Sequence, residues 1–499
     1  MVMQSRPIGR VVIGLTLAFL CRSASWALTD EETFRVFRFN FVNPGARALG
    51  MGGAFGAIAD DATATQANPA GLNSILTPEF FLEYRSLDRD PTIDRSNVGS
   101  LSVDLSTGAR DLPFLGLTTV TNPDQSGDLS FVSFALPLRP TLGGRHIRLA
   151  ASRQVVLSED VTLSSGSNST EARFAFPSFP NTVNGSTVEA YSVDTLVSGG
   201  RSADIVDWNV AGSLELTHDF SVGLTLTYST LDLTSHTRTD VNDPLQLFLD
   251  PTHPRFPAQP SLDVYETSAE GTDSEMAFTI GVHLHPDSVF ASGRSPWQFG
   301  LVYHRGETFS VPESTILNGL PADSFDTTVV VPDRYALSGS YRSPLHWLFS
   351  IELERVEYSD LLQGFRSGVN YLTSGQVAGG AFGIDPTRSV EFTADDGLIP
   401  RAGLEYILWP GGRGGRQLAL WGGYYRTPDD RIRMSEFNSD DGSVNAAYMK
   451  AFPGGEPSHH LTGGVGFDVG PSSFRLAGET SDQQNQVVGS FTYRFGAGR

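Results

Sequence analysis

The sequence has almost no cysteine, no long apolar run beyond its N-terminus, and a shortage of positive charge. Cys21 is the only cysteine among 499 residues, so neither a disulfide framework nor a cysteine-ligated metal site is expected. The formal net charge of −21 argues against a nucleic-acid partner, because phosphate binding requires lysine and arginine. Without a long apolar segment, the remaining way to span a membrane is a closed β-barrel.

The N-terminus has the pattern of a secretory signal peptide. Arg6 and Arg10 provide a positively charged start, and Val11 to Leu20 form an apolar core too short to cross a bilayer as a helix. Ser25-Trp26-Ala27 then places small residues before a cleavage point. We therefore expect residues 1–27 to be removed during export, which would leave a mature chain without a thiol.

The strongest signal in the mature chain is the alternation of apolar and polar residues over segments of about ten residues, the length that a tilted membrane strand needs. Segments 220–229, 274–285, 347–354 and 461–469 are the best examples. In one of them, Met276, Phe278, Ile280, Val282 and Leu284 share one face, and Ala277, Thr279, Gly281, His283 and His285 share the other. A hydrophobic content of 39 % suits a barrel, because half of each wall strand faces water.

The pattern predicts an all-β, transmembrane antiparallel barrel of about fourteen strands, within a range of about twelve to sixteen. Between the strands, short connections alternate with long polar ones, near 158–207, 236–273, 312–333, 359–399 and 428–458. Region 97–120 is expected to add a hairpin or an excursion. The predicted wall strands are 79–87, 129–138, 145–157, 208–217, 220–235, 274–285, 297–311, 334–342, 347–358, 400–409, 417–427, 459–469, 473–480 and 485–495.

Aromatic residues near strand ends favour a membrane barrel over a soluble sandwich, because such rings suit the bilayer interface. The chain also ends close to an aromatic strand, 487–495, which resembles the assembly signal of outer-membrane barrels, although Gly496 to Arg499 follow Phe495. The interfacial candidates are Tyr341, Trp347, Tyr358, Trp409, Trp421 and Tyr425.

Several charged residues fall on the inward face of the predicted strands, and we interpret them as a solvated or ion-paired lumen. Arg153 is the exception, because it falls on the outward face of strand 145–157, where a charge is costly in lipid. That strand is therefore our candidate for an interrupted or kinked strand. The inward charged positions are Glu215, His283, His285, Glu352, Glu354, Arg401, Glu405, Arg475, Glu479 and Arg494.

Residues 45–72, which precede the first predicted strand, are packed with glycine and alanine and do not alternate. Small side chains allow backbones to approach closely, and glycine permits tight turns. This composition suits a compact plug inside a barrel, but a periplasmic lead-in without a plugging role fits it equally well.

Three motifs in this region resemble the FadL family of outer-membrane transporters, also called the OmpP1/FadL/TodX family. They are Gly50 to Gly53, Ala57-Ile58-Ala59-Asp60-Asp61-Ala62, and Asn68-Pro69-Ala70-Gly71-Leu72. Looser similarity continues in the C-terminal half, and the middle of the chain, 90–330, matches only in style. The later matching segments are Pro332-Asp333-Arg334-Tyr335-Ala336-Leu337, Pro400-Arg401-Ala402-Gly403-Leu404-Glu405-Tyr406 and Leu418-Ala419-Leu420-Trp421-Gly422-Gly423-Tyr424.

The resemblance implies a signal peptide (1–27), an N-terminal hatch (28–78) that plugs the lumen, and a barrel (79–499) in the outer membrane. It implies a monomer that passes long-chain fatty acids or hydrocarbons by diffusion and releases them sideways through the wall, surrounded by membrane lipid and lipopolysaccharide. In the hatch, Asn68 would hydrogen-bond to the wall, Pro69 would fix a turn, and Ala70 and Gly71 would allow close packing. Asp60 and Asp61 belong to the same hatch or gate. The substrate, the pocket residues and the position of the opening do not follow from the sequence.

Two other functions fit parts of the sequence. A related group of barrels that resembles PorV serves as docking partners in protein secretion, and a closed lumen would favour that role. An outer-membrane hydrolase is the enzymatic alternative, but no Gly-x-Ser-x-Gly or His-Glu-x-x-His motif is present, so we expect no enzyme and no cofactor.

Metal binding is also weakly indicated. His283 and His285 share a face, and His304 on the next strand is the third candidate, but no carboxylate completes a ligand set. Three acid pairs in the long connections would suit either solvated turns or a Ca²⁺ site: Asp395-Asp396, Asp429-Asp430 and Asp440-Asp441. No metal is therefore predicted.

Overall fold

The computed structural model confirms the barrel. The signal peptide, Cys21, residues 28–38 of the expected hatch, region 97–120 and the pair Asp440-Asp441 lie outside the described part. The described residues are 39–89, 124–138, 145–164, 168–173, 182–183, 186–187, 190–242, 264–289, 295–317, 320–363, 390–409, 416–437, 455–482 and 484–496.

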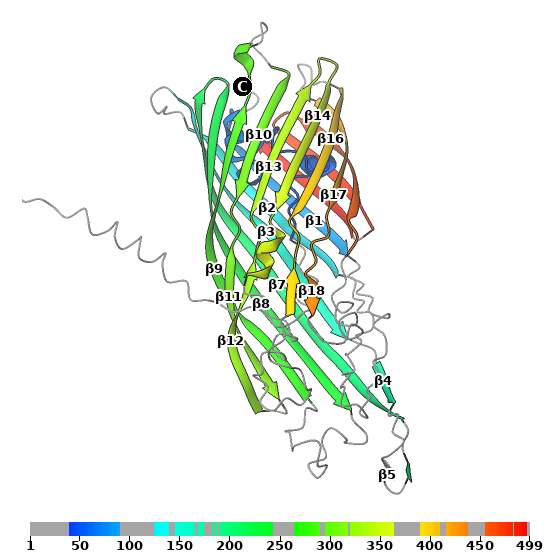
Figure 1. Ribbon diagram of the computed structural model, residues 1–499. Coiled ribbons are helices and arrows are strands. Elements are labelled where there is room, and N and C mark those ends of the chain that lie inside the picture. Colours follow the sequence, from blue (N-terminus) through cyan, green and yellow to red (C-terminus); the bar gives the residue numbers. More distant parts are fainter. Residues whose placement is uncertain are drawn as a thin grey trace, which may run out of the picture.

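Fourteen antiparallel wall strands form a closed barrel (Figure 1). Consecutive wall strands pair with each other, and the last pairs with the first from Glu79↔Arg494 to Arg89↔Gln484. The wall is built from β1 (Glu79–Arg89), β2 (Asp124–Pro137), β3 (Ile147–Ser164), β7 (Ala190–Thr217), β8 (Phe220–Asn242), β9 (Val264–Leu284), β10 (Trp297–His304) with β11 (Thr308–Leu317), β12 (Leu320–Val330) with β13 (Arg334–Arg342), β14 (Trp347–Val356), β16 (Gly397–Trp409), β17 (Arg416–Thr427), β19 (Ser458–Val469), β20 (Ser472–Thr480) and β21 (Gln484–Arg494).

Smaller elements lie on the connections and ahead of the wall. β4 (Asn168–Arg173) pairs with β7, while two-stranded pieces join β5 (Thr182–Val183) to β6 (Ser186–Thr187) and β15 (Val390–Thr393) to β18 (Arg433–Phe437). The helical pieces are α3 (Ala46–Gly50), α4 (Ala64–Ala67), η1 (Pro69–Ser74), η2 (Asp287–Val289) and η3 (Tyr358–Leu362). No helix in the described residues is long and apolar enough to cross a membrane.

All fourteen predicted wall strands are present, but strand 297–311 is interrupted. β10 and β11 are separated at 305–307, and β12 and β13 at 331–333. Asp333 holds this break, because its carboxylate accepts hydrogen bonds from Tyr303 Oη and from the Gly306 backbone N–H, both at 2.7 Å. The break therefore depends on an aspartate in one of the motifs that match the family.

The predicted long connections are wrong in part, because several wall strands continue into them. β7 starts at Ala190, β8 runs to Asn242, and β12 occupies 320–330. These extensions lie beyond the apolar belt, where neither face must contact lipid. Outward side chains there, such as Ser202 and Asp204, are polar, while inward ones, such as Ile205 and Val329, are apolar, so the apolar-outward alternation that marks a membrane strand is lost.

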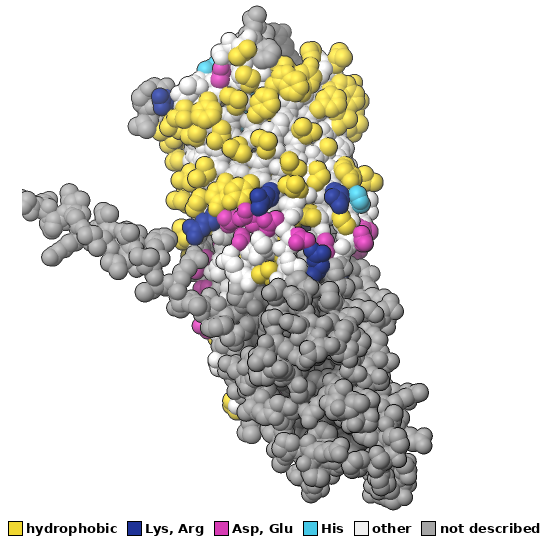
Figure 2. Space-filling view, viewed as in Figure 1, with side chains coloured by type: hydrophobic (Ala, Val, Ile, Leu, Met, Phe, Trp, Pro, Cys, Tyr) yellow, Lys and Arg dark blue, Asp and Glu magenta, His cyan; other side chains and the backbone are white. Residues whose placement is uncertain are grey.

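The outer surface carries an apolar belt over the half of the barrel that has the short turns, and a row of charged side chains lies along its edge (Figure 2). Exposed members include Leu226, Ile280, Leu337 and Ile351. A contiguous apolar surface of this kind on a closed barrel is what a lipid bilayer requires.

Only some of the aromatic residues predicted to lie at the bilayer interface are on the outer surface. Trp409 is exposed, and Trp347 stacks near Tyr406 with ring centroids 4.2 Å apart. Trp421, Tyr425 and Tyr358 are instead buried in the lumen, so their assignment to the bilayer interface is wrong. On β17, Trp421 and Tyr425 share the inward face, and nothing in the spacing of a glycine-rich strand distinguishes that face from the outer one.

Residues 39–75, here called the lumen segment, lie inside the barrel in the half that carries the belt (Figure 1). Its alanines and larger apolar residues pack with small wall residues such as Ala211 and Ala419 into one buried cluster. Leu49, Met51, Phe55, Ile58 and Leu72 are each no more than 1 % exposed. The small-residue composition therefore corresponds to a segment packed inside the barrel.

A charge placed in the apolar belt tests this assignment. Ile280→Lys should lower the free energy of unfolding in phospholipid vesicles by about 2–4 kcal/mol, because the ammonium would face lipid. Thr272→Lys, on the same face of β9 but outside the belt, is the control and should change it by less than about 1 kcal/mol. Equal losses for the two variants would contradict a lipid-facing belt.

Candidate functional site

Asn68 joins the lumen segment to the barrel wall. It follows α4, caps η1, and is fully buried. Its amide nitrogen donates to the carbonyl of Gly56 at 2.9 Å and to that of Val282 on β9 at 3.0 Å, while Oδ1 accepts from the Ala70 N–H at 3.1 Å. The hydrogen bond between Asn68 and the wall that the resemblance implies is therefore present, although the role of Asn68 in gating stays a prediction.

The next three residues form the first turn of η1. Pro69 occupies its first position, where the missing N–H costs nothing. The Ala70 carbonyl accepts a hydrogen bond from Ser221 Oγ of β8 at 3.1 Å. A Cβ on Gly71 would come within 3.0 Å of Ala59, so only glycine allows the turn to pack against the earlier part of the segment.

Asp60 and Asp61 both form ion pairs. Asp60 pairs with Arg47 of the same segment at 2.6 Å, and Asp61 pairs with Arg475 of β20 at 3.0 Å. Burial acts to raise the pKa of Asp60, but the charge of Arg47, with smaller contributions from Arg342 and Arg475, outweighs it and holds that pKa below its ordinary value. Asp60 therefore holds Arg47 within the segment, while Asp61 ties the segment to the wall.

Arg47 is the centre of a larger polar contact. Its Nε donates to Glu405 of β16 at 2.6 Å, and the indole N–H of Trp421 donates to the same carboxylate at 2.9 Å. Glu352 of β14 accepts the Gly56 N–H at 2.8 Å. Thr225 of β8 donates to the Thr65 carbonyl at 2.7 Å, so polar wall residues bind the backbone of the segment along its length.

Five inward-facing glycines of the wall allow the lumen segment to lie directly against it, and we call this contact the seat of the segment. A Cβ on Gly223, Gly281, Gly300, Gly403 or Gly423 would lie within 3.0 Å of its atoms, mostly of its backbone. These five positions come from five different strands and face inward. The alternation of segment 274–285 places Gly281 on the inward face without indicating its role; glycine recurring on one face of alternating strands was the available signal.

Most other inward charged residues form ion pairs, as the prediction of an ion-paired lumen requires. Arg401 pairs with Glu354 at 2.5 Å, and Arg494 with Glu79 at 2.8 Å. His460 contacts Glu479 at 2.7 Å, whereas His459 points outward. In the described part of the chain, all the predicted lumen charges except Glu215 thus bond to other wall residues or to the lumen segment.

The histidines do not form a metal site. His283 donates to the Ala57 carbonyl at 2.7 Å and contacts His285 at 2.9 Å, while His304 bonds Thr279 at 2.9 Å. Within the described ranges, no cluster of three or more histidine, cysteine or acidic residues is arranged to hold a metal. Asp396 pairs with Arg355, and Asp395 with Arg433.

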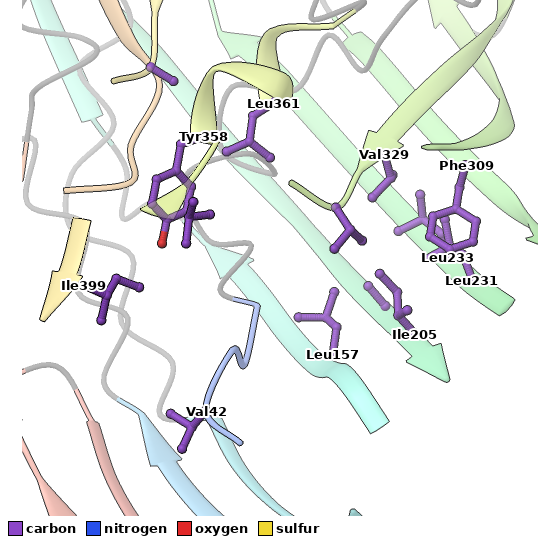
Figure 3. Packing of buried hydrophobic residues seen from close by; sticks show 14 of the residues in the cluster. Val42, Leu157, Ile205, Leu231, Leu233, Phe309, Val329, Tyr358, Leu361 and Ile399 are labelled. Carbon is purple, nitrogen blue, oxygen red and sulfur yellow. The ribbon is translucent and has the colours of Figure 1, made fainter. Parts of the chain in front are cut away.

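Beyond the segment, the other half of the lumen is apolar. Leu157, Ile205, Leu231, Leu233, Phe309 and Val329 point inward from neighbouring strands (Figure 3). Tyr358, Leu361 and Ile399 belong to the same cluster, as does Val42 of the lumen segment. A cavity of about 80 Å³ remains beside Phe41, Tyr358 and Tyr425, which is too small for a long acyl chain.

The pairing of β2 with β3 ends next to this apolar region, and we call this end of the ladder the split. Their ladder ends at Phe131↔Gln154, and β3 has a bulge between Val155 and Leu157. The backbone carbonyl of the bulge residue Val156 accepts a hydrogen bond from the Asn40 N–H of the lumen segment at 3.3 Å. The expected kinked strand 145–157 therefore carries an irregularity.

Arg153 lies at the end of the same ladder, where its guanidinium donates to the Leu129 carbonyl at 3.0 Å. On the outside of the barrel, Leu129, Arg153, Val155 and Tyr228 line a groove of about 1020 Å³ that begins at this split. The outward charge is thus used in a contact between the two diverging strands.

A closed fourteen-stranded barrel with a segment seated in its lumen has the fold of the FadL-type outer-membrane transporters. The crystal structure of a Pseudomonas aeruginosa FadL homologue is similar, with a TM-score of 0.53 and 10 % identity over 92 % of this chain and 99 % of that one. The Pseudomonas putida toluene transporter TodX gives a TM-score of 0.50 and 13 % identity over the same shares. No family model and no curated protein matches the sequence.

Filling a glycine seat should displace the lumen segment. Gly281→Ala would place a methyl group against Asn68 and Pro69, so we expect a higher single-channel conductance in planar bilayers. Gly489→Ala is the matched control, because a Cβ there meets nothing within 4 Å. An unchanged conductance in Gly281→Ala would show that contact with the inward glycines is not what keeps the segment in place and the lumen closed.

Proposed function

We propose that this protein is an outer-membrane channel that passes long-chain fatty acids or other hydrophobic compounds by diffusion, acting as a monomer. The observation that carries the proposal is the apolar half of the lumen, which meets a split in the wall at the β3 bulge. Leu157 belongs to the apolar cluster and Val156 packs against it, while Val155 lines the outer groove. A path from the apolar half of the lumen to the outer surface therefore needs to cross only one strand irregularity.

The physics of the cargo supports a lateral exit. Lipopolysaccharide blocks apolar molecules from the outer leaflet, and a water-filled pore gives them no favourable path. Apolar side chains provide favourable burial inside the barrel, and release into lipid keeps the molecule out of water. Both steps are downhill, so no energy source is needed.

The lumen segment is the proposed gate. Asn68, Pro69, Ala70 and Gly71 hold it against β8 and β9, and Asp61 holds it against β20. At its start, Asn40 bonds the bulge residue Val156. One continuous segment thus contacts both the inner face of the barrel wall and the proposed exit. Its movement would open the path from the lumen to that exit.

Asn68→Ala tests the gate. The substitution removes two hydrogen bonds to carbonyls that then stay buried, which should weaken the seat by about 1–3 kcal/mol. We expect the uptake of labelled oleate or toluene by cells to change at least threefold relative to the unaltered protein. Thr480→Ala on β20 is the control, because Thr480 lies on the outward side of the wall, away from the proposed exit, and its hydroxyl bonds Asn485.

Cells without the protein set the baseline for this measurement. If the unaltered protein speeds the entry of neither compound class, the transport proposal fails. The docking role that resembles PorV would then become the better explanation, and it would be tested by capture of a secretion partner. The similar structures include a toluene transporter, which supports transport as the first function to test.

Deleting Val156 tests the exit. Removal of the extra residue restores regular pairing of β3, so uptake should fall at least fivefold while the barrel still folds and migrates as a heat-modifiable band. Deleting Leu408, at the bulge of β16 between Ile407 and Trp409, is the matched control and should leave uptake unchanged. Loss of uptake in both deletions would contradict an exit at β3.

A further inference from the structure

Two basic residues face each other on the outer surface, at the edge of the apolar belt that borders the long connections. Arg426 of β17 is paired with His459 of β19 in the ladder between these strands, just before connection 428–458. Both side chains point outward, because their neighbours Tyr425 and His460 are buried in the lumen. Side chains opposite each other in a ladder have Cβ atoms about 5 Å apart, so one anion can contact both.

Neither basic residue has an acidic partner. Among the residues that the structure describes, no carboxylate forms an ion pair with Arg426 or His459. Acidic and basic side chains otherwise lie together along this edge (Figure 2), where Arg355 pairs with Asp396 at 2.7 Å. The chain has 56 acidic residues and only 35 lysines and arginines, so two neighbouring basic residues without a carboxylate indicate a local preference for an external anion.

Tyr424 orients the histidine. Its hydroxyl lies 2.7 Å from Nδ1 of His459, and the two rings stack with their centroids 6.1 Å apart. When the hydroxyl donates to Nδ1, the imidazole carries its proton on Nε2, which is then available to donate to another group. The guanidinium of Arg426 adds a planar fork of N–H donors that matches the oxygens of a phosphate. Two strands thus offer donors to a single phosphate group.

Toward the short turns, the same outward rows of β17 and β19 become apolar. On β19 they continue with Leu461, Val465 and Phe467, all of which are exposed. The outward glycines Gly422 and Gly463 lie opposite each other in the ladder, and a Cβ on Gly422 would meet nothing within 4 Å. The surface beside the basic pair therefore leaves room for hydrocarbon chains. Donors for a phosphate at one end of an apolar surface match the two parts of a phospholipid or a phosphorylated glycolipid.

We propose that Arg426, His459 and Tyr424 bind the phosphate of a lipid in the outer leaflet, a phosphorylated glycolipid of the lipopolysaccharide class, whose acyl chains lie along β17 and β19. The long connections of outer-membrane barrels face the outside, which places this edge of the belt at the head groups of that leaflet. Free phosphate would use the same donors but would leave the adjoining apolar surface without a role. The inference concerns how the barrel contacts its membrane and does not depend on the proposed transport.

A matched pair of lipids isolates the contribution of the phosphate. Purified protein in detergent is titrated with diphosphoryl lipid A or with the same lipid after its phosphates have been removed, and native mass spectrometry measures the apparent Kd of the first bound lipid. We expect the phosphorylated lipid to bind at least about tenfold more tightly. Displacement of the bound lipid by excess inorganic phosphate would identify free phosphate as the ligand and would overturn the assignment to a lipid.

The double variant Arg426→Gln, His459→Gln removes both basic groups and keeps polar side chains at the two positions. Its preference for the phosphorylated lipid should fall below about threefold. Arg416→Gln is the matched control, because Arg416 is exposed on the same outward face at the other end of β17, where Val469 is opposite it. This control should keep the preference of the unaltered protein. Heat-modifiable migration checks that every variant is folded.

Two results would contradict the site. The first is an equal affinity of the unaltered protein for the two lipids, or a double variant that keeps the preference. The second is an Arg416→Gln control that loses the preference as fully as the double variant does, because the attraction would then depend on overall charge and not on the position of Arg426 and His459.

Discussion

Direct contact between the backbone of the lumen segment and the barrel wall is the constraint on which the rest of the structure depends. Inward glycines on five strands remove the side chains that would otherwise hold the segment away. At this distance the segment can form hydrogen bonds with wall groups, as Asn68 does with the Val282 carbonyl. The seat also fixes the height of the segment in the barrel, so that one half of the lumen is filled and polar contacts dominate it.

The apolar character of the other half of the lumen is the second consequence of where the segment lies. With the segment seated, the lumen beyond it is lined by side chains such as Ile205, Leu231 and Phe309, which no segment covers in the described part of the chain. The cluster reaches Leu157 at the β3 bulge, where the ladder to β2 has ended. The filled half of the lumen is therefore followed by the apolar half and then by the split between β2 and β3. The lumen segment contacts all three.

Much of this arrangement could be predicted from the sequence, because membrane strands must alternate to face lipid and water. The wall strands, the small-residue segment and the irregular strand around Arg153 were all accessible by that reasoning. The strand extensions beyond the belt were not, since without lipid their outer face is polar and the apolar-outward alternation is lost. The inward orientation of Trp421 was also missed, because it depends on the distant partner Glu405.

The ion pairs of the lumen segment have a consequence for the order of assembly. Asp61 pairs with Arg475 of β20, and the Ala46 N–H reaches Ser490 of β21 at 3.4 Å, across more than four hundred residues of intervening chain. The segment is synthesised first, yet part of its binding surface belongs to the strands that are made last. Such distant contacts form late and slowly. The seat is therefore complete only when β21 closes on β1, which couples burial of the segment to the final step of barrel formation.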